Sequence, residues 1–260
     1  MKQFCFTVDD NIRFFKELTE GTYKSIFDHP YLGVYRRLHQ KYGLKVQLNL
    51  FYEMPGFNLS QMTDRYRQEW IDNADWLKLS FHSRLENAYP YEHSGYEEVL
   101  TDCQNVHREI RRFASDKSLG LTTTVHCCRT TEQGINALQD SGVKGLLGLY
   151  GKMEKPRSSY QSTPVEGDLI RKGEIVVRND MAYAGIDIVL NCFSTEEILS
   201  QLSALADRDF VKVMIHEQYF YADYSAYQPD FEQKLDATFA RLAENGFRST
   251  FFEEWLGGKR

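Results

Sequence analysis

Short apolar runs alternate along the chain with segments whose apolar residues recur at helical spacing. Runs of this kind, bounded by polar residues, predict buried parallel strands, and the intervening segments predict helices. We expect the strands near residues 4–8, 45–51, 77–82, 121–126, 145–150, 186–191, 211–216 and 249–252. Alternating strands and helices are typical of βα units arranged around a parallel sheet.

Three of the intervening segments carry clear helix signals. The apolar side chains between residues 96 and 113 recur on one helical face that includes Cys103, so this cysteine is expected in the core. The sequence Ser-Thr-Glu-Glu from Ser194 is a capping pattern that predicts a helix start at that point. A further helix begins near Asp230 and is expected to stop at Gly246.

The pattern breaks between residues 151 and 185, where Pro, Ser and Gly residues precede the apolar run 174–178. We expect an inserted loop or hairpin there, at the mouth of the fold. With seven or eight predicted strands in 260 residues, the chain fits one domain over residues 1–260. The expected fold is α/β, in the form of a single distorted (β/α)7–8 barrel.

Polar residues capable of metal binding or acid–base chemistry end three of the predicted strands. Asp9 and Asp10 follow the first strand, and His82 and His216 end two others. Because parallel barrel strands present their carboxyl ends on one face, we expect these side chains to converge. Two adjacent buried acids repel each other and lose hydration, and a bound cation is the usual compensation.

A hydrolytic metal site needs one carboxylate as a ligand and a second that can accept a proton from the attacking water. Asp9 and Asp10 could divide these two roles, and the alternative is that both cap the following helix. Glu86 stands four residues after His82. On a helical turn that spacing lets both side chains grip one cation, although it also occurs in ordinary surface pairs.

These motifs resemble those of a known family. The sequence Phe-Thr-Val-Asp-Asp ending at Asp10 resembles the opening motif of the polysaccharide deacetylases with NodB homology, carbohydrate esterase family 4. The sequence His-Ser-Arg-Leu-Glu from His82 resembles their second motif, His-Ser/Thr-x-x-His. The resemblance implies Asp9 as the base, with Asp10 and His82 as ligands of zinc or a similar divalent ion. Glu86 replaces the second histidine, which would move the metal preference toward manganese or iron, or leave a site that has lost its metal.

The sequence Val-Met-Ile-His ending at His216 resembles the family's last motif, Leu-x-His, which implies that His216 protonates the leaving group. An imidazole that titrates near physiological pH suits this role, and a buried histidine bonded at a strand end is the alternative. Glu217 is a candidate to orient the ring or to contact substrate. Tyr219 and Tyr221 belong to an aromatic run that fits either a sugar-stacking loop or a packed lid.

The fourth predicted strand ends at His126, followed by two cysteines and Arg129, where the family has Arg-x-Pro-aromatic. Arg129 is a candidate for the charge that orients the base, and His126 is a candidate extra ligand in place of the missing histidine. A nucleophilic Cys127 beside His126 is disfavoured, because adjacent strand residues face opposite ways. The family's Asp-x-x-Asp-Trp motif has no counterpart.

Composition narrows the class of partner. The net charge of −6 and the lack of a basic stripe argue against nucleic acid. No apolar run approaches the length of a membrane span, and the chain enters its first strand without a signal-peptide core, so we expect no membrane partner and a cytoplasmic location. The five cysteines contain no Cys-x-x-Cys pair. The sequence does not indicate an oligomeric state.

The sequence therefore predicts a metal-dependent hydrolase that removes an acyl group, first of all acetyl, from a sugar or a related amide or ester. The substrate would be a small molecule or an oligosaccharide. The expected cofactor is a divalent metal, zinc in the first place, with manganese or iron as alternatives. The competing hypothesis is a barrel of the same fold that binds or processes carbohydrate without hydrolysis or without metal.

Overall fold

The computed structural model describes residues 1–86, 91–151 and 158–258 of the chain. Within these residues the helices are α1 (Arg13–Glu20), α2 (Pro30–Tyr42), α3 (Arg67–Asp72), α4 (Tyr96–Phe113), α5 (Glu132–Asp140), α6 (Pro164–Arg171), α7 (Thr195–Ala204), α8 (Phe231–Glu244) and α9 (Phe252–Gly258). The strands are β1 (Gln3–Asn11), β2 (Val46–Phe51), β3 (Glu53–Met54), β4 (Phe57–Asn58), β5 (Leu77–Ser83), β6 (Thr122–Thr123), β7 (Gly145–Gly148), β8 (Val176–Arg178), β9 (Met181–Gly185), β10 (Ile188–Val189), β11 (Phe210–His216) and β12 (Arg248–Ser249). No helix in the described ranges is both long enough and apolar enough to cross a membrane.

A parallel sheet forms the centre of the molecule. Its strands follow the order β10-β11-β1-β2-β5, and β12 also pairs with β1. A second sheet has the order β6-β7-β9-β8, in which β8 and β9 are antiparallel and the other pairs are parallel. The fold is therefore α/β, as expected.

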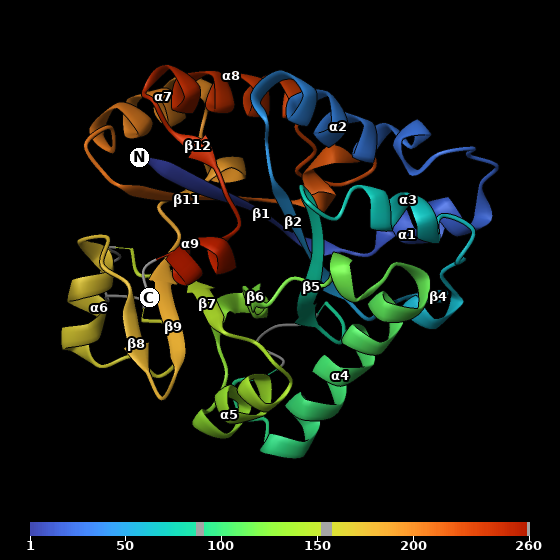
Figure 1. The fold of residues 1–260 in the computed structure, drawn as a ribbon, viewed down its shortest axis with the longest axis horizontal. Coiled ribbons are helices and arrows are strands. Elements are labelled where there is room, and N and C mark those ends of the chain that lie inside the picture. Colours follow the sequence, from blue (N-terminus) through green and yellow to red (C-terminus); the bar gives the residue numbers. More distant parts are fainter. Residues whose placement is uncertain (87–90, 152–157, 259–260) are drawn as a thin grey trace.

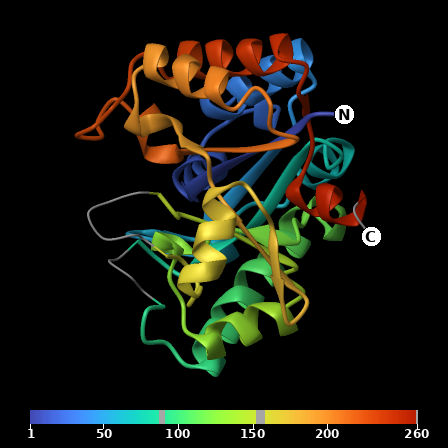
Figure 2. The same ribbon diagram turned by 90° about the vertical axis from the view of Figure 1, so that its left-hand side faces the viewer.

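The expected closed barrel is not established. One parallel bridge, Leu79 with Leu119, connects β5 to the segment before β6. Over the described residues the hydrogen-bonded strands otherwise divide into the two larger sheets and the small β3-β4 pair. Figure 1 shows α2, α7 and α8 along one side of the main sheet, and α4 and α5 on the other side of the molecule. Figure 2, turned by 90°, shows α6 and the β8-β9 hairpin away from the α2, α7 and α8 row.

The helix signals in the sequence are confirmed. The apolar face of α4 is buried, Cys103 included. Ser194 caps α7 through a capping box with Glu197. The helix α8 is followed by Gly246 in the left-handed region, with φ of 80°. These elements bury apolar faces around the sheet and form its scaffold.

The segment 151–185 differs in part from the expected insertion. It contains the hairpin β8-β9, whose turn residues Asn179 and Asp180 adopt the positive φ values that such turns require. However, β9 pairs in parallel with β7, so the second strand of the hairpin is part of the second sheet. Residues 152–157 of the expected insertion lie outside the described part of the chain.

Several predicted strands are shorter than expected. The run 121–126 contributes only Thr122–Thr123 and is followed by a 3-10 segment at His126–Cys128, in which Cys127 and Cys128 adopt positive φ. The run 145–150 forms Gly145–Gly148, and the run 186–191 forms only Ile188–Val189. The run 249–252 contributes the end of β12 and then enters α9.

A buried ion pair joins the end of the second sheet to the main sheet. Asp187 lies between β9 and β10, and its Oδ2 accepts hydrogen bonds from both the backbone N–H and the Nζ of Lys212 on β11, each at 2.8 Å. The Asp187 N–H donates to the Lys212 carbonyl. The Lys212 side chain is 1% exposed. A buried ammonium is tolerated only while it stays paired.

We therefore expect Asp187→Ala to lower the free energy of unfolding by about 3–5 kcal/mol, because it leaves the Lys212 ammonium buried without its carboxylate. Urea-induced unfolding measures this loss. The double variant Asp187→Ala/Lys212→Met should recover much of the stability. Equal stability of the single variant and the unmodified protein would contradict this role for the pair.

Candidate metal centre and active site

The end of β1 carries both acids of the Asp9-Asp10 pair to the same place. Val8 pairs with Leu48 and Asn11 pairs with Leu50. Between these two pairs, β1 therefore contains one residue more than β2. This bulge coincides with a φ of 65° at Asp10. Consecutive strand residues ordinarily point to opposite faces, and a bulge re-aims one of them. The two carboxylates consequently serve one site instead of two faces.

Asn11 holds the bulge in place. Its Nδ2 donates to the carbonyls of Val8 and Asn49, at 2.6 and 3.1 Å. Its Oδ1 accepts from the hydroxyl of Tyr31 at 2.7 Å. The Asn11 side chain is fully buried. These bonds satisfy buried polar groups that the irregular ladder would otherwise leave unpaired, and they stabilise the strained backbone at Asp10.

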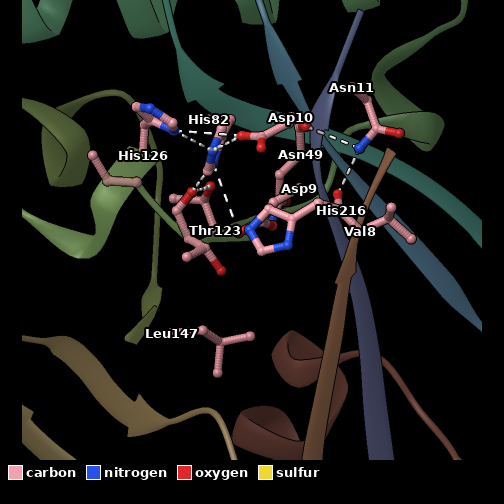
Figure 3. A network of polar contacts seen from close by, with 12 residues as sticks. Val8, Asp9, Asp10, Asn11, Asn49, His82, Thr123, His126, Leu147 and His216 are labelled. Carbon is pink, nitrogen blue, oxygen red and sulfur yellow. Dashed lines mark hydrogen bonds and ion pairs between the residues drawn. The ribbon is translucent and has the colours of Figure 1, made fainter. Parts of the chain in front are cut away.

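Asp10, His82 and His126 form a compact cluster of ligand atoms (Figure 3). The Nε2 of His82 lies 3.0 Å from Asp10 Oδ1 and 3.1 Å from His126 Nδ1, and the third side of this triangle, from His126 Nδ1 to Asp10 Oδ1, is 3.4 Å. His82 ends β5 within a second bulge, between the pairs Leu50–Phe81 and Phe51–Ser83. His126 comes from the segment after β6.

This triangle fits a divalent cation. Bonds of about 2.0–2.2 Å to nitrogen and oxygen place the ligands of a tetrahedral zinc ion roughly 3.3 Å apart, close to the three separations in the cluster. Two imidazoles and one carboxylate are also a donor set that catalytic zinc sites use, with a further position open. The residues present therefore fit a metal.

Neighbouring groups orient the ligands. The Nδ1–H of His82 donates a hydrogen bond to the backbone carbonyl of Thr124. The other ring nitrogen, Nε2, is therefore the one available to bind a metal. Gln218 Nε2 donates to the second oxygen of Asp10 at 2.7 Å. The ring of Phe51 packs against both imidazoles, with centroids 5.2 Å away in each case. The cluster is thus preorganised by side chains from several elements.

Asp10 and His126 shift each other's pKa in opposite directions. Burial disfavours the Asp10 carboxylate, but the hydrogen bonds from His126 and His82 outweigh it and hold the pKa of Asp10 well below its usual range. Burial likewise disfavours the charged His126, but its bond to Asp10 raises the pKa of His126 to about 10. A protonated imidazole therefore supplies positive charge where a cation would bind.

Asp9 lies beside the cluster and is bound differently. Its Oδ1 accepts a hydrogen bond from Asn49 Nδ2 at 2.7 Å, and its Oδ2 lies 4.0 Å from His82 Nδ1. Burial raises the pKa of Asp9, and its interactions with His82 and His216 and the hydrogen bond from Asn49 only partly offset this effect. Asp9 is thus the acid of the pair that is easier to protonate.

His216 is brought next to Asp9, as the sequence predicted. The two residues are register partners on β11 and β1. The Nδ1 of His216 lies 2.8 Å from Asn191 Oδ1, so it donates to this amide oxygen and leaves Nε2 free. The alternative, that Asp9 and Asp10 cap the following helix, is not supported, because the N–H groups of Ile12, Arg13 and Phe14 donate to Glu217.

Glu217 caps α1 instead. Its carboxylate accepts hydrogen bonds from the backbone N–H groups of Ile12, Arg13 and Phe14, and from the hydroxyl of Tyr221. Burial raises the pKa of Glu217 to about 7, against the effect of these bonds. These contacts give Glu217 a structural role at the start of α1. It also belongs to the lining of the cavity described below, and the two roles considered for it, orienting His216 or contacting substrate, stay predictions.

The remaining predicted site residues lie around this centre. Glu86 is exposed and stands outside the ligand cluster, because the chain after β5 bends and does not form a helical turn. Arg129 pairs with Glu92 at 2.5 Å. Tyr219 is half-buried, with its ring 6.1 Å from that of His216. Tyr221 is buried beneath the guanidinium of Arg13.

A cavity of about 720 Å³ opens beside the cluster. It is lined by Asp10 and Phe51 from the site, by Tyr221 and Tyr224 from the segment after β11, and by Glu86 among others. Its size suits a ligand of one or a few rings, and its aromatic walls offer flat apolar surface. Glu86 therefore borders the cavity although it does not join the triad.

Three residues that orient the site were missed at the level of sequence. Asn49 binds Asp9, Gln218 binds Asp10 and Asn191 binds His216. A signal existed for Asn49, because Gln47 and Asn49 alternate with leucines in a predicted strand and so place polar groups on one face. The contacts of Gln218 and Asn191 depend on tertiary packing.

Comparisons with solved structures support a fold of the NodB type. A CE4-family pseudoenzyme from Bacillus anthracis aligns over 97% of this chain and 64% of its own, with a TM-score of 0.51 and 11% identity. A 4-alpha-glucanotransferase from Thermococcus litoralis aligns over 99% of this chain and 40% of its own, with a TM-score of 0.62 and 10% identity. A family 4 acetyl xylan esterase from Clostridium thermocellum, in complex with a cobalt ion, aligns over 99% of this chain and 92% of its own. Its TM-score is 0.54 and its sequence identity is 12%.

These likenesses concern the fold alone, because the identities are low. The chain spans less than two thirds of the length of the first two structures. No protein-family model matches the sequence, and no curated protein matches it significantly. The chemistry must therefore be argued from the site itself.

We expect His126→Ala to weaken zinc binding by at least about a hundredfold, as much as His82→Ala, because each removes one ligand of the triangle. Isothermal titration of the metal-free protein with zinc measures the affinity. Glu86→Ala is the matched control and should change the affinity less than about threefold. A large loss in Glu86→Ala with little loss in His126→Ala would restore the ligand set that the sequence motif implied.

Proposed function

We propose that the protein is a metal-dependent hydrolase that removes an acyl group, acetyl in the first place, from a sugar or a related amide or ester. The observation that carries this proposal is the triangle of Asp10, His82 and His126 beside a second carboxylate, Asp9, that is not part of it. His216 stands next to Asp9 on the neighbouring strand. A ligand set, a base and an acid are thus available within one site.

Asp10, His82 and His126 would hold the metal. Once bound, a divalent ion would supply Lewis-acid polarisation of the acyl carbonyl and would make water more acidic. The two nitrogens and one oxygen favour zinc, and manganese and iron are the alternatives. Glu86 is exposed and is not part of this ligand set, and the zinc affinity of Glu86→Ala tests whether it contributes to metal binding.

Asp9 would act as the general base. Its Oδ1 is occupied by Asn49, so Oδ2 is the oxygen that can accept the proton of the attacking water. The raised pKa of Asp9 brings the carboxylate closer to the working range of a base at neutral pH.

His216 would act as the general acid. Its Nδ1–H donates to Asn191, which leaves Nε2 to carry a proton to the leaving amine or alcohol. The aromatic cavity next to Asp10 would bind the sugar ring of a small molecule or an oligosaccharide. Its walls include Tyr221 and Tyr224.

The second candidate is a carbohydrate-binding protein of the same fold that does not catalyse hydrolysis. The observation in its favour is that one of the similar structures is described as a pseudoenzyme. Metal content and turnover separate the two candidates. The hydrolase requires a stoichiometric divalent ion and release of acetate from acetylated sugars, whereas retention of sugar binding without acetate release would favour the binding protein.

We expect Asp9→Asn and His216→Ala each to lower kcat by at least about a hundredfold, because each removes a group that transfers a proton. Acetate release from N-acetylglucosamine oligomers and acetylated xylan measures the effect. The matched controls are Asp102→Asn and His107→Ala, which change a buried acid and a buried histidine on α4. They should lower stability with little effect on kcat. Near-normal turnover in Asp9→Asn would rule out this base.

A further inference from the structure

A row of buried neutral polar side chains leads from Asp9 into the interior of the fold. Asn49 and Gln47 share one face of β2, and Thr122 faces them from β6. All three side chains are at most 2% exposed. Leucine or valine would be the expected occupants of such positions in a parallel sheet, because buried amides are costly unless every group is bonded.

The hydrogen bonds run in one direction along this row. Thr122 Oγ1 donates to Gln47 Oε1 at 3.1 Å, and Gln47 Nε2 donates to Asn49 Oδ1 at 2.8 Å. Gln47 Nε2 also donates to the Thr122 carbonyl at 2.9 Å. Asn49 Nδ2 then donates to Asp9 Oδ1 at 2.7 Å.

This pattern fixes which way the Asn49 amide faces. An amide oxygen accepts and an amide nitrogen donates, so an Asn49 turned by 180° would set its nitrogen against the donor of Gln47 and its oxygen against the Asp9 carboxylate. Both contacts would then be repulsive. The Gln47 amide is fixed in the same way, because its nitrogen already serves the carbonyl of Thr122.

The fixed Asn49 amide in turn restricts the orientation of the Asp9 carboxylate, because it binds one of the two carboxylate oxygens. With Oδ1 held by Asn49, Oδ2 is the oxygen on the side of His82, 4.0 Å from its Nδ1. Arg129, the candidate charge for this task in the sequence, pairs with Glu92. A neutral amide therefore takes the place where a cation was expected.

We propose that Asn49 is the positioning residue for the base Asp9, and that Gln47 and Thr122 hold Asn49 in the orientation that this task requires. The proposal rests on the proposed function in so far as Asp9 is the base. The Asn49 side chain is fully buried and is bonded to Asp9 and Gln47. Its effect on the reaction passes entirely through the direction of the Asp9 carboxylate.

Asn49→Leu tests this role, because leucine has a similar size and cannot donate to Asp9. We expect kcat on N-acetylglucosamine oligomers to fall about tenfold to a hundredfold, since small misplacements of a reacting group cost rates of this order. KM and the zinc affinity of the metal-free protein should each stay within about twofold. Gln47→Leu, which frees the Asn49 amide without removing it, should give a smaller fall in the same direction.

A double-mutant cycle separates positioning from a general loss of structure. In the Asp9→Asn background, Asn49→Leu should lower the residual kcat by less than about twofold, because there is no longer a base to position. Thr238→Val is the matched control, since Thr238 is buried on α8, outside this row, and its hydroxyl bonds to the carbonyl of Lys234. It should leave kcat unchanged in both backgrounds.

An equal fall of kcat in both backgrounds, or a rise of KM alone, would overturn the proposal. If Asn49→Leu does not fold, Asn49→Ser and Gln47→Leu carry the same cycle. If the unmodified protein, loaded with zinc, releases no acetate, the proposed hydrolase fails, and crystal structures then decide the positioning role. An Asp9 carboxylate turned away from its present direction in the variant would support it, and an unchanged direction would overturn it.

Discussion

The burial of two adjacent carboxylates at the end of β1 is the constraint around which the site is built. Two unpaired acids in this position would be too costly to keep ionised. The structure compensates them by different means: neutral Asn49 binds Asp9, whereas His82, His126 and Gln218 surround Asp10. The pKa of Asp9 is consequently raised and that of Asp10 is lowered. Neighbours of different charge thereby give two identical residues opposite pKa shifts, which suit the base and the ligand of the proposed reaction.

The convergence of the two acids depends on backbone geometry that no side-chain pattern announces. Regular alternation would place Asp9 and Asp10 on opposite faces of the sheet. The bulge before Asn11, with a positive φ at Asp10, turns both toward the site. Such a conformation is unfavourable for an aspartate and persists only where surrounding bonds hold it. Asn11, bonded to three partners from different elements, is the residue that does so.

Local periodicity was enough to predict the parallel strands and the capped helices, because buried strands and caps have short-range signatures. That Asp9, His82 and His216 lie together followed from the rule that parallel strands present their carboxyl ends on one face, whereas the bulge that re-aims Asp10 had no signature in the sequence. Local periodicity failed where the chain leaves regular structure. The ligand role given to Glu86 assumed a helical turn after His82, whereas the chain bends there and Glu86 is exposed. His126, a candidate extra ligand in the sequence, does join Asp10 and His82, although the strand that it was expected to end stops at Thr123. Barrel closure depends on pairing between distant strands, which periodicity does not report.

Three consecutive residues at the end of β11 and directly after it contact the end of β1 and the start of α1. His216 pairs in register with Asp9, Glu217 caps α1 and Gln218 binds Asp10. The proposed acid, base and one proposed ligand are therefore held by a single junction between two central strands, while His82 and His126 reach it from β5 and from the segment after β6. A glucanotransferase and a pseudoenzyme share this fold. The frame is thus compatible with several chemistries or with none, and the reaction depends on the few side chains that the junction brings together.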